Sequence, residues 1–302
     1  MKSLGLILST VSLLSAFEYG LKPVKVNESV YCFFGKPEVM DTNNNGNMVN
    51  SCFVDTGSSW LVIDSGPTYK YAKEAYSHVK KIKNTPVSHV INTHIHDDHW
   101  LGNGFYLSLG ANILGSFEFE NLVDVVQTPR MAHRISPKAY SLTVPTIPTD
   151  LIHEDEMLNI GSMQVQIMYV DYKAHTQSDL FVYSPQIKTL FGGDLIFNDR
   201  LPSLRDGNIK GWIKVLDKIK KMDVKTVVGG HGELTDVSAL DLTYGYLSEL
   251  RQKVQDALDN GMEIDETVEK IKMKSYENVA FYDVMHRQNV EATYRMLEWE
   301  DE

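Results

Sequence analysis

Three of the ten histidines of this chain lie within six residues, in the stretch HIHDDH at residues 94–99. Imidazole and carboxylate groups are costly to bury without partners, and they are also common nitrogen and oxygen ligands of Zn²⁺. Their concentration here therefore indicates a metal site. We expect His94 and His96 to bind one cation, and Asp98 and His99, across a turn, to bind a second.

Four ligands would leave two metal ions under-coordinated, so further donors are expected where other strands end. Three such donors follow predicted strands over residues 163–170, 189–192 and 226–229, and they are His175, Asp194 and His231. Glycine flanks the last two donors, and glycine permits the close backbone approach that a crowded metal site requires.

The elements that must position these donors follow an alternating order. Strands are predicted over residues 30–34, 49–54, 60–64, 87–92 and 111–115, with a helix over 69–81, a turn or helix from His99, and a break at Asn103-Gly104. Strands over 155–160, 163–170, 179–184, 189–192 and 226–229 follow, with a helix over 210–221. From Val237 the chain is predicted to be helical. This alternation is typical of an α/β sheet protein.

The segment from Ser116 to Asp150 is less regular. A helix is predicted over residues 118–126, and the prolines of residues 143–149 argue against a central strand. We interpret the segment as a covering insertion that could act as a lid. The isolated His133 and His153 are predicted to face solvent.

The order of the donors resembles the metallo-β-lactamase superfamily. His94-x-His96-x-Asp98-His99 is followed by His175, Asp194 and His231, and the resemblance extends from about residue 30 to about residue 233. It implies an α/β fold of the αββα four-layer sandwich type, here with a C-terminal helical extension. The predicted organisation is a signal peptide at 1–16, the metallo-β-lactamase-fold domain at 17–235 and the helical extension at 236–302.

The resemblance also assigns roles to the residues. It implies that one metal is held by His94, His96 and His175, that the second is held by Asp98, His99 and His231, and that Asp194 bridges them. Asp64, at the end of an early strand, would support the metal loop without binding metal itself. The implied cofactor is two zinc ions, with iron or manganese as alternatives.

Two zinc ions that share a water lower its pKa toward neutrality and hold hydroxide as a nucleophile. Asp98 would be the catalytic residue that orients this hydroxide and accepts its proton. The resemblance thus implies hydrolysis of an ester, thioester, lactone or amide. Because zinc β-lactamases lack a bridging aspartate, β-lactam cleavage is expected only as a side activity. The loop at 198–208 most resembles that of periplasmic hydrolases associated with sulfur oxidation and quinoprotein systems.

Two other functions remain open from the sequence. Mononuclear iron persulfide dioxygenases of the same fold retain these motif residues. The motif therefore distinguishes poorly between such dioxygenases and hydrolases. A non-catalytic metal-binding protein is the third hypothesis, although every one of the seven ligand positions keeps a histidine or an aspartate.

Arg200, Asp206 and Asn208 lie in the loop after Asp194, where they could bind a small-molecule substrate or simply belong to a solvated loop. Trp100 could line an apolar wall or pack in the core. The single Asp-Thr-Gly, at residues 55–57, does not indicate an aspartic protease, because that class requires two such loops.

The net charge of -11 and the pI near 5.4 argue against a nucleic-acid partner. Lys2 and the apolar run Leu4–Leu14, ending in Ser15-Ala16, predict a secretory signal peptide. The mature protein is therefore expected to be periplasmic or secreted, without stable membrane insertion. The oligomeric state is left open.

The only two cysteines, Cys32 and Cys52, lie in strand-like apolar runs. In an oxidising compartment they could form a disulfide across neighbouring antiparallel strands. Two buried free thiols are the equal alternative.

Overall fold

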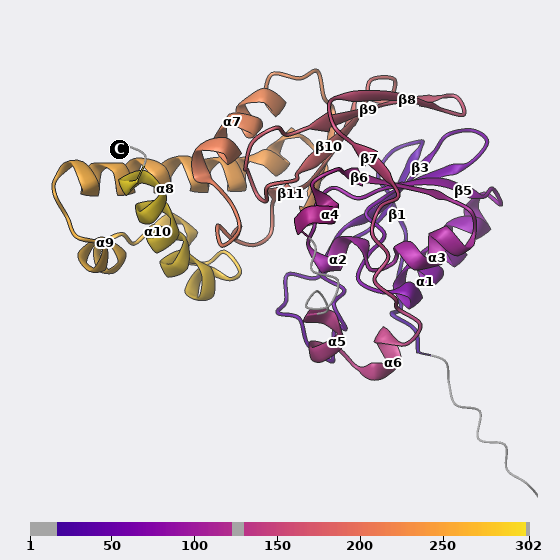
Figure 1. Ribbon diagram of the computed structural model, residues 1–302, viewed down its shortest axis with the longest axis horizontal. Coiled ribbons are helices and arrows are strands. Elements are labelled where there is room, and N and C mark those ends of the chain that lie inside the picture. Colours follow the sequence, from indigo (N-terminus) through magenta and orange to yellow (C-terminus); the bar gives the residue numbers. More distant parts are fainter. Residues whose placement is uncertain (1–16, 123–129, 300–302) are drawn as a thin grey trace, which may run out of the picture.

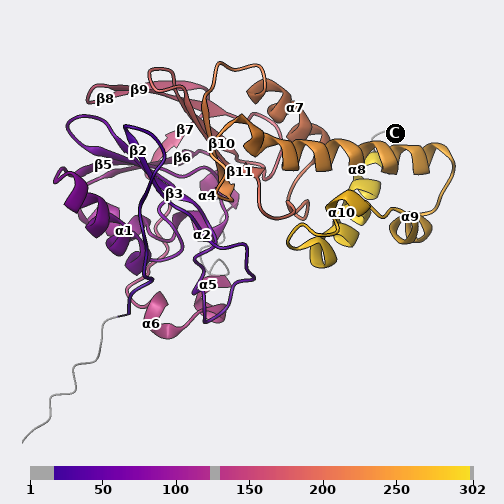
Figure 2. The ribbon, with the colours of Figure 1, turned by 180° about the vertical axis from the view of Figure 1, so that it is seen from behind.

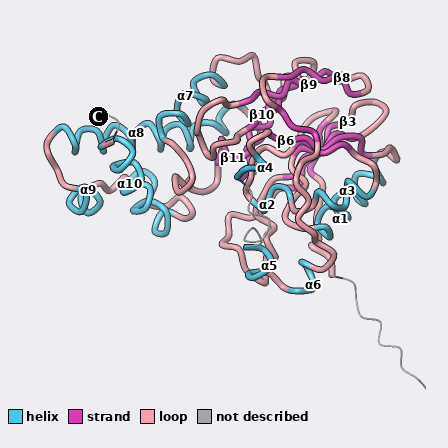
Figure 3. Tube along the Cα trace, viewed as in Figure 1, coloured by secondary structure: helices cyan, strands magenta, loops and turns pink. Residues whose placement is uncertain are grey.

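The computed structural model describes residues 17–122 and 130–299, in which twelve strands form two sheets between helices (Figure 3). The predicted leader at 1–16 and residues 123–126 of the helix predicted over 118–126 lie outside the described residues. The first sheet contains, in spatial order, β1 (Val24–Lys25), β2 (Val30–Phe33), β3 (Ser51–Asp55), β4 (Trp60–Ile63), β5 (Val87–Ile91), β6 (Asn112–Ser116) and β7 (Asp150–Ile152). The second sheet has the order β12 (Thr226–His231), β11 (Thr189–Phe197), β10 (Leu180–Ser184), β9 (Met163–Tyr169) and β8 (Glu156–Ile160).

Each sheet combines antiparallel and parallel strands. In the first sheet β1 to β4 are antiparallel and β4 to β7 are parallel, whereas in the second sheet only β11 and β12 are parallel. The helices are α1 (Tyr69–Ile82), α2 (Asp97–Trp100), α3 (Asn103–Ser108), α4 (Phe119–Leu122), α5 (Arg130–Arg134), α6 (Pro137–Tyr140), α7 (Ile209–Ile219), α8 (Asp241–Asp259), α9 (Ile264–Lys270) and α10 (Tyr282–Glu298). Two 3₁₀ turns occupy Val237–Leu240 and Lys274–Tyr276.

Side-chain alternation along the strands produces the layers, because successive residues of a strand point to opposite faces of the sheet. On β3, Cys52 and Val54 join the apolar core between the two sheets, and Phe53 joins the core beneath α1 and α3. The second sheet is covered by α7 and α8 on its outer face. Helices thus cover the outer faces of two sheets that pack on each other, with α1 and α3 below the first sheet in Figure 1, which confirms the αββα sandwich predicted from the resemblance.

Helix α1 illustrates how local sequence sets an element. Thr68 caps its N-terminus by accepting a hydrogen bond of 3.1 Å from the amide of Tyr71, which satisfies one of the otherwise unpaired first-turn donors. The buried residues Tyr71, Ala72, Ala75 and Val79 repeat with helical spacing and face the first sheet. The helix therefore lies within one residue of the predicted bounds.

Several predicted boundaries differ from the structure, and two of the differences involve glycine. Strand β11 does not end at Gly192 but continues to Phe197, so Asp194 lies within a strand. The pairing of β11 with β12 shifts register around Gly193, whose positive φ of 51° lets the strand kink without ending. Asn103 begins α3 instead of breaking a helix, because its buried side chain bonds Asn92 and Ser65.

The C-terminal helices form an extension that packs on the second sheet. In Figures 1 and 2, α8, α9 and α10 project from the end of the molecule opposite α1 and α3. Apolar residues of α7, α8 and α10 share one continuous core with β10, β11 and β12. The helical character predicted from Val237 onward is thus confirmed, and Gly261 lies between α8 and α9 as expected.

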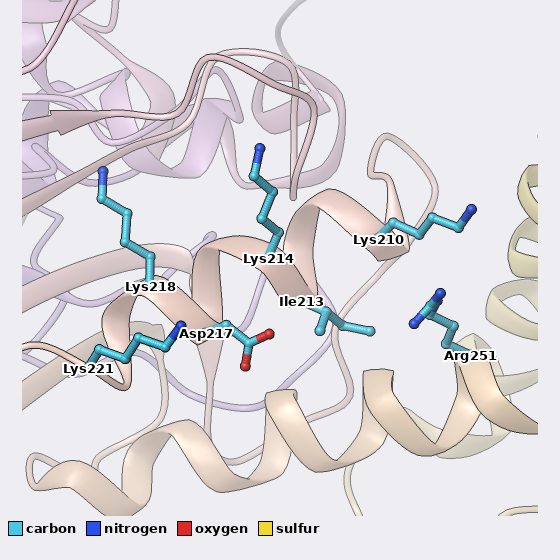
Figure 4. A pocket seen from close by; sticks show the side chains of 7 residues that line it. All are labelled: Lys210, Ile213, Lys214, Asp217, Lys218, Lys221 and Arg251. Carbon is cyan, nitrogen blue, oxygen red and sulfur yellow. The ribbon is translucent and has the colours of Figure 1, made fainter.

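A surface groove lies between α7 and α8 (Figure 4). Its lining is mainly basic and consists of Lys210, Ile213, Lys214, Asp217, Lys218, Lys221 and Arg251. None of the predicted site residues lines it. In the described part of the chain, no helix is both long and apolar enough to cross a membrane.

A disulfide joins Cys32 on β2 to Cys52 on β3, so of the two alternatives left open by the sequence the structure contains the bridge. The two residues are directly paired across the antiparallel strands, which places their Cα atoms 4.1 Å apart. Both side chains are buried between the sheets.

Replacing both cysteines with alanine is expected to lower the free energy of unfolding by about 3 kcal/mol, because the cross-link restricts the unfolded chain. Urea denaturation of the oxidised protein and of the double variant measures this difference. Wild-type protein under reducing conditions is the control, and it should resemble the variant. Equal midpoints for the oxidised wild type and the variant would contradict the prediction.

Candidate metal centre

All seven predicted metal ligands converge at one edge of the sandwich, although they come from distant parts of the chain. His94 and His96 lie in the loop after β5, and Asp98 and His99 lie in the short helix α2. The remaining three come from the second sheet: His175 from the loop between β9 and β10, Asp194 from β11, and His231 from the end of β12. The site therefore spans both sheets.

The first group contains His94, His96, His175 and Asp194. Nδ1 of His96 lies 3.1 Å from Nε2 of His94 and 3.0 Å from Nε2 of His175. Oδ2 of Asp194 lies 3.4 Å from Nε2 of His175 and 3.7 Å from Nε2 of His94. Three imidazole nitrogens and one carboxylate oxygen thus face one another.

The second group contains Asp98, His99 and His231. Oδ2 of Asp98 lies 3.8 Å from Nε2 of His99 and 3.9 Å from Nε2 of His231. The other oxygen of Asp194, Oδ1, lies 3.2 Å and 3.3 Å from the same two nitrogens. Asp194 is therefore shared, with one oxygen directed at each group.

The donors fit metal ions chemically. Within each group every ligand atom lies within 4.8 Å of every other, which is close enough for all of them to bind one central metal ion. Nε2 of His99 and Oδ1 of Asp194 are fully buried and have no hydrogen bond, although buried polar atoms are normally paired. Nitrogen and carboxylate ligands in this number are those of zinc enzymes.

The electrostatics of the site favour added positive charge. Burial lowers the pKa of His94 and of His175 well below the ordinary value, which keeps both imidazoles in the neutral form that binds metal. Burial also opposes a charge on His99, but three surrounding carboxylates raise its pKa well above the ordinary value. A bound cation would replace that proton and satisfy the same carboxylates.

The outer nitrogens of several ligand histidines are fixed by hydrogen bonds, which set the tautomer that presents the inner nitrogen. Nδ1 of His231 donates to the carbonyl oxygen of Met48 at 2.6 Å. Asp64 supports one ligand directly and a second through Thr93. Its carboxylate lies 2.8 Å from Nδ1 of His99, and it accepts bonds of 2.8 Å from both the amide and the hydroxyl of Thr93. The hydroxyl of Thr93 in turn lies 3.1 Å from Nδ1 of His94.

Replacing Asp64 with asparagine is expected to weaken metal binding by about 10–100-fold, because the neutral amide supports the His99 tautomer less well. Asparagine tolerates the left-handed backbone of this residue, whose φ is 56°, so the fold should be retained. Competition with a chromophoric chelator measures the affinity. Asp55→Asn, which changes a carboxylate paired with Lys83, is the control. Unchanged affinity in the Asp64 variant would refute the supporting role.

The predicted substrate residues divide into three different environments. Nη2 of Arg200 lies 3.0 Å from Nε2 of His231. Oδ2 of Asp206 lies 3.2 Å from the outer Nε2 of His96, so Asp206 also orients a ligand. Asn208 caps α7 by accepting a bond of 3.0 Å from the amide of Gly211, and none of its described contacts reaches the ligands.

Arg130 was missed by the sequence analysis. It donates to the carboxylate of Asp97 through both Nε and Nη2, and its Nη2 lies 3.1 Å from Oδ1 of Asp98. The covering segment thus contributes a cation that fixes two carboxylates of the motif. Nothing in the local sequence indicates this pairing, because 33 residues separate Arg130 from Asp97.

Three other predicted residues lie away from the ligand atoms. The side chain of Trp100 is completely buried beside Phe119 and donates to the carbonyl oxygen of Ile95, so it packs in the core. His133 and His153 are exposed, as predicted.

Comparisons with known proteins agree with this geometry. The family model of the metallo-beta-lactamase superfamily matches residues 44–231. The chain is 25% identical to a metallo-beta-lactamase type 2 of Elizabethkingia meningoseptica over 209 residues, covering 68% of this chain and 77% of the relative. It is also 20% identical to a linear primary-alkylsulfatase of a Pseudomonas strain over 261 residues, covering 73% of this chain but only 49% of that protein.

Solved structures show the same fold. A metallo-beta-lactamase from Pontibacter korlensis superposes with a TM-score of 0.60 at 24% identity, covering 76% of this chain and 99% of that one. A crystal structure of VMB-1 superposes with a TM-score of 0.61 at 22% identity, covering 77% of this chain and 99% of that one. With the family match spanning more than half of its length and the ligand residues assembled, the chain belongs to the metallo-β-lactamase superfamily and is a metal-dependent hydrolase.

Proposed function

We propose that this protein is a dinuclear zinc hydrolase that uses water to cleave an ester, thioester, lactone or amide bond in a small molecule. The observation that carries the proposal is the shared carboxylate of Asp194, whose two oxygens face two separate groups of ligands. His94, His96 and His175 would hold one zinc ion, and Asp98, His99 and His231 would hold the other. Bound zinc would supply Lewis acidity toward the scissile group and a water of lowered pKa.

Asp98 is the residue best placed to act on the reacting water. Burial alone would raise the pKa of Asp98, but the nearby His99, Arg130 and His231 together lower it below the ordinary carboxyl value. The side chain is therefore an anion that accepts hydrogen bonds. Arg130 fixes one carboxylate oxygen, which leaves the other directed at the ligand nitrogens of His99 and His231. This arrangement supports a role in orienting the water and accepting its proton.

We propose only the class of bond that is cleaved, which is an ester, thioester, lactone or amide. The relatives include proteins named for β-lactams and for alkyl sulfates, so both compounds belong in an activity panel. We expect β-lactam cleavage to be a side activity, because the bridging position is occupied by Asp194. The relationship to sulfur-oxidation and quinoprotein-associated hydrolases stays a prediction from the loop at 198–208.

We further propose that the protein acts after export, in the periplasm or outside the cell. The apolar leader at residues 1–16 and the disulfide between Cys32 and Cys52 support this location, because disulfides persist in oxidising compartments. Amino-terminal sequencing of the exported protein should begin at Phe17. An intact Met1 on protein recovered outside the cytoplasm would contradict cleavage at this site.

Elemental analysis of the mature protein, purified without added metal, tests the proposed function directly. About two zinc ions per chain would support the hydrolase, and assays with ester, thioester, lactone and amide panels would follow. About one iron per chain, together with oxygen-dependent persulfide consumption, would instead indicate the dioxygenase chemistry known in this fold. Two zinc ions without turnover of any panel member would favour a metal-binding role.

A further inference from the structure

Asn289 is a buried polar side chain of the C-terminal extension that binds the loop after β11. It lies on α10 and is 1% exposed. Its Oδ1 accepts a hydrogen bond of 3.0 Å from the amide of Leu204, and its Nδ2 donates to the carbonyl oxygen of Pro202 at 2.8 Å. Nδ2 also donates to the hydroxyl of Tyr246, 3.1 Å away. Both N–H groups and the oxygen of the side chain are therefore paired, as burial of a polar group requires.

A chain of hydrogen bonds behind Asn289 fixes the orientation of its amide. Nε2 of His286 lies 3.0 Å from the carbonyl oxygen of Ile271, which can only accept, so this nitrogen carries a proton. Burial lowers the pKa of His286, which favours the neutral ring and leaves Nδ1 as an acceptor. Nδ1 lies 3.1 Å from the hydroxyl of Tyr246. The hydroxyl therefore donates to His286 and accepts from Asn289, so a turned amide would lose its bonds.

The loop that Asn289 binds carries Asp206, which contacts a ligand histidine of the first group. Oδ2 of Asp206 lies 3.2 Å from Nε2 of His96. The other ring nitrogen of His96, Nδ1, faces Nε2 of His94 and Nε2 of His175. A carboxylate at Nε2 keeps the ring proton there and leaves the lone pair of Nδ1 for a metal ion. The position of Asp206 thus determines how well His96 presents its ligand nitrogen.

Asp206 depends on the backbone of this loop for its position. Residues 198–208 contain no helix or strand, and the side chain of Asp206 is 42% exposed. Apart from the ligand, its described side-chain partner is the exposed Arg205. The loop is anchored on one side by Asn289 and on the other by the amide of Asn208, which donates to the carbonyl oxygen of Ala174 at 2.7 Å. Loss of either anchor would let the carboxylate move away from its histidine.

We infer that Asn289 is a positioning residue for the metal centre: it fixes the loop that holds Asp206 against His96, so the C-terminal extension sets how tightly the first group binds its ion. The inference deepens the proposed function and rests on the metal-binding part of that proposal, whatever bond is cleaved. Asn289 lies outside residues 44–231, the range matched by the family model.

Asn289→Leu tests the positioning role, because it removes the amide and keeps a side chain of similar size. Competition with a chromophoric chelator should show an overall affinity for zinc at least about threefold weaker, since two bonds to the loop are lost. The control is Thr293→Val, one turn further along α10, where the buried hydroxyl has no described hydrogen bond. This variant should keep the wild-type affinity. Wild-type affinity in folded Asn289→Leu would overturn the inference.

Double variants distinguish positioning from general destabilisation. Asp206→Asn alone should weaken zinc binding by about 10–100-fold. In that background Asn289→Leu should change the affinity by less than about twofold, because the carboxylate that it positions is gone. In the Asp64→Asn background, where the altered support belongs to His99 of the second group, Asn289→Leu should keep its full effect. An equal effect in the two backgrounds would show that Asn289 only stabilises the fold.

A measurement without metal separates this inference from the proposed function. In the metal-free protein, amide hydrogen exchange over residues 203–207 should be at least about threefold faster in Asn289→Leu than in the wild type, and unchanged in Thr293→Val. If the wild type binds no zinc, the proposed function fails, whereas faster exchange would still support the positioning of the loop. Unchanged exchange would overturn that positioning whether or not zinc binds.

Thermal unfolding verifies that the variants fold. Should Asn289→Leu not fold, Tyr246→Phe takes its place, because it removes only the hydroxyl that fixes Asn289 from behind. The expected losses of zinc affinity and of exchange protection are then at least about twofold. Wild-type values of both quantities in Tyr246→Phe would count against the inference in the same way.

Discussion

Replacing Asp98 with alanine is expected to lower kcat by roughly 10²–10⁴-fold, the range found when a positioned acid or base is removed. The carboxylate is buried, fixed by Arg130 and directed toward the ligand nitrogens of His99 and His231. Alanine removes both a proposed ligand and the group proposed to orient the water. Steady-state kinetics on the best substrate of the panel measure the effect.

The fold should survive this change, because Arg130 keeps its bonds to Asp97 when Asp98 is absent. Thermal unfolding of the variant checks this point. Asp223→Ala, which deletes an exposed carboxylate paired with Lys188, is the matched control and should keep wild-type kinetics. Turnover near the wild-type rate in folded Asp98→Ala would refute the mechanism.

Replacing Asp194 with alanine is expected to reduce the metal content from about two ions per chain to nearly none, whereas His231→Ala should retain about one. The reason is geometric: Asp194 directs one oxygen at each group of ligands, and His231 belongs to one group only. Loss of one charged ligand also removes the anion that offsets the two cations. Elemental analysis after dialysis against a weak chelator measures the stoichiometry.

Asp179→Asn provides a control for burial without ligation. Asp179 is a buried carboxylate in the same loop region as His175, where it accepts bonds from the amide and hydroxyl of Thr176. It belongs to neither ligand group, so two metal ions should remain in the variant. One ion retained by Asp194→Ala would show that the carboxylate is not shared.

The ligand residues could be predicted because their signals are local. His94, His96 and His99 fall within one short stretch. Asp194 and His231 are distant in sequence, but each is preceded by glycines that let the backbone come close to the site. At residue 230, for example, a side chain would collide with the carboxylate of Asp194. The strands were predictable for a related reason, since alternation of apolar residues is set by which face of each sheet is buried.

Long-range contacts within the site could not be predicted. Arg130 reaches Asp97 across 33 residues, and Asp206 reaches His96 across 110 residues. Neither contact has a spacing that sequence alone reveals. Asn208 caps α7, a local role that the sequence analysis did not assign, and its part in substrate binding stays a prediction. The extent of β11 was missed because a glycine pair was interpreted as a strand end, although it allows a kink.

Every described strand up to β7 belongs to the first sheet, and every strand from β8 onward belongs to the second. The chain passes between them at residues 153–155, so its two contiguous halves carry complementary parts of the ligand set. His94, His96, Asp98 and His99 lie in the first half, and His175, Asp194 and His231 lie in the second. Two fragments divided there would each lack a complete centre, so only their association could assemble one.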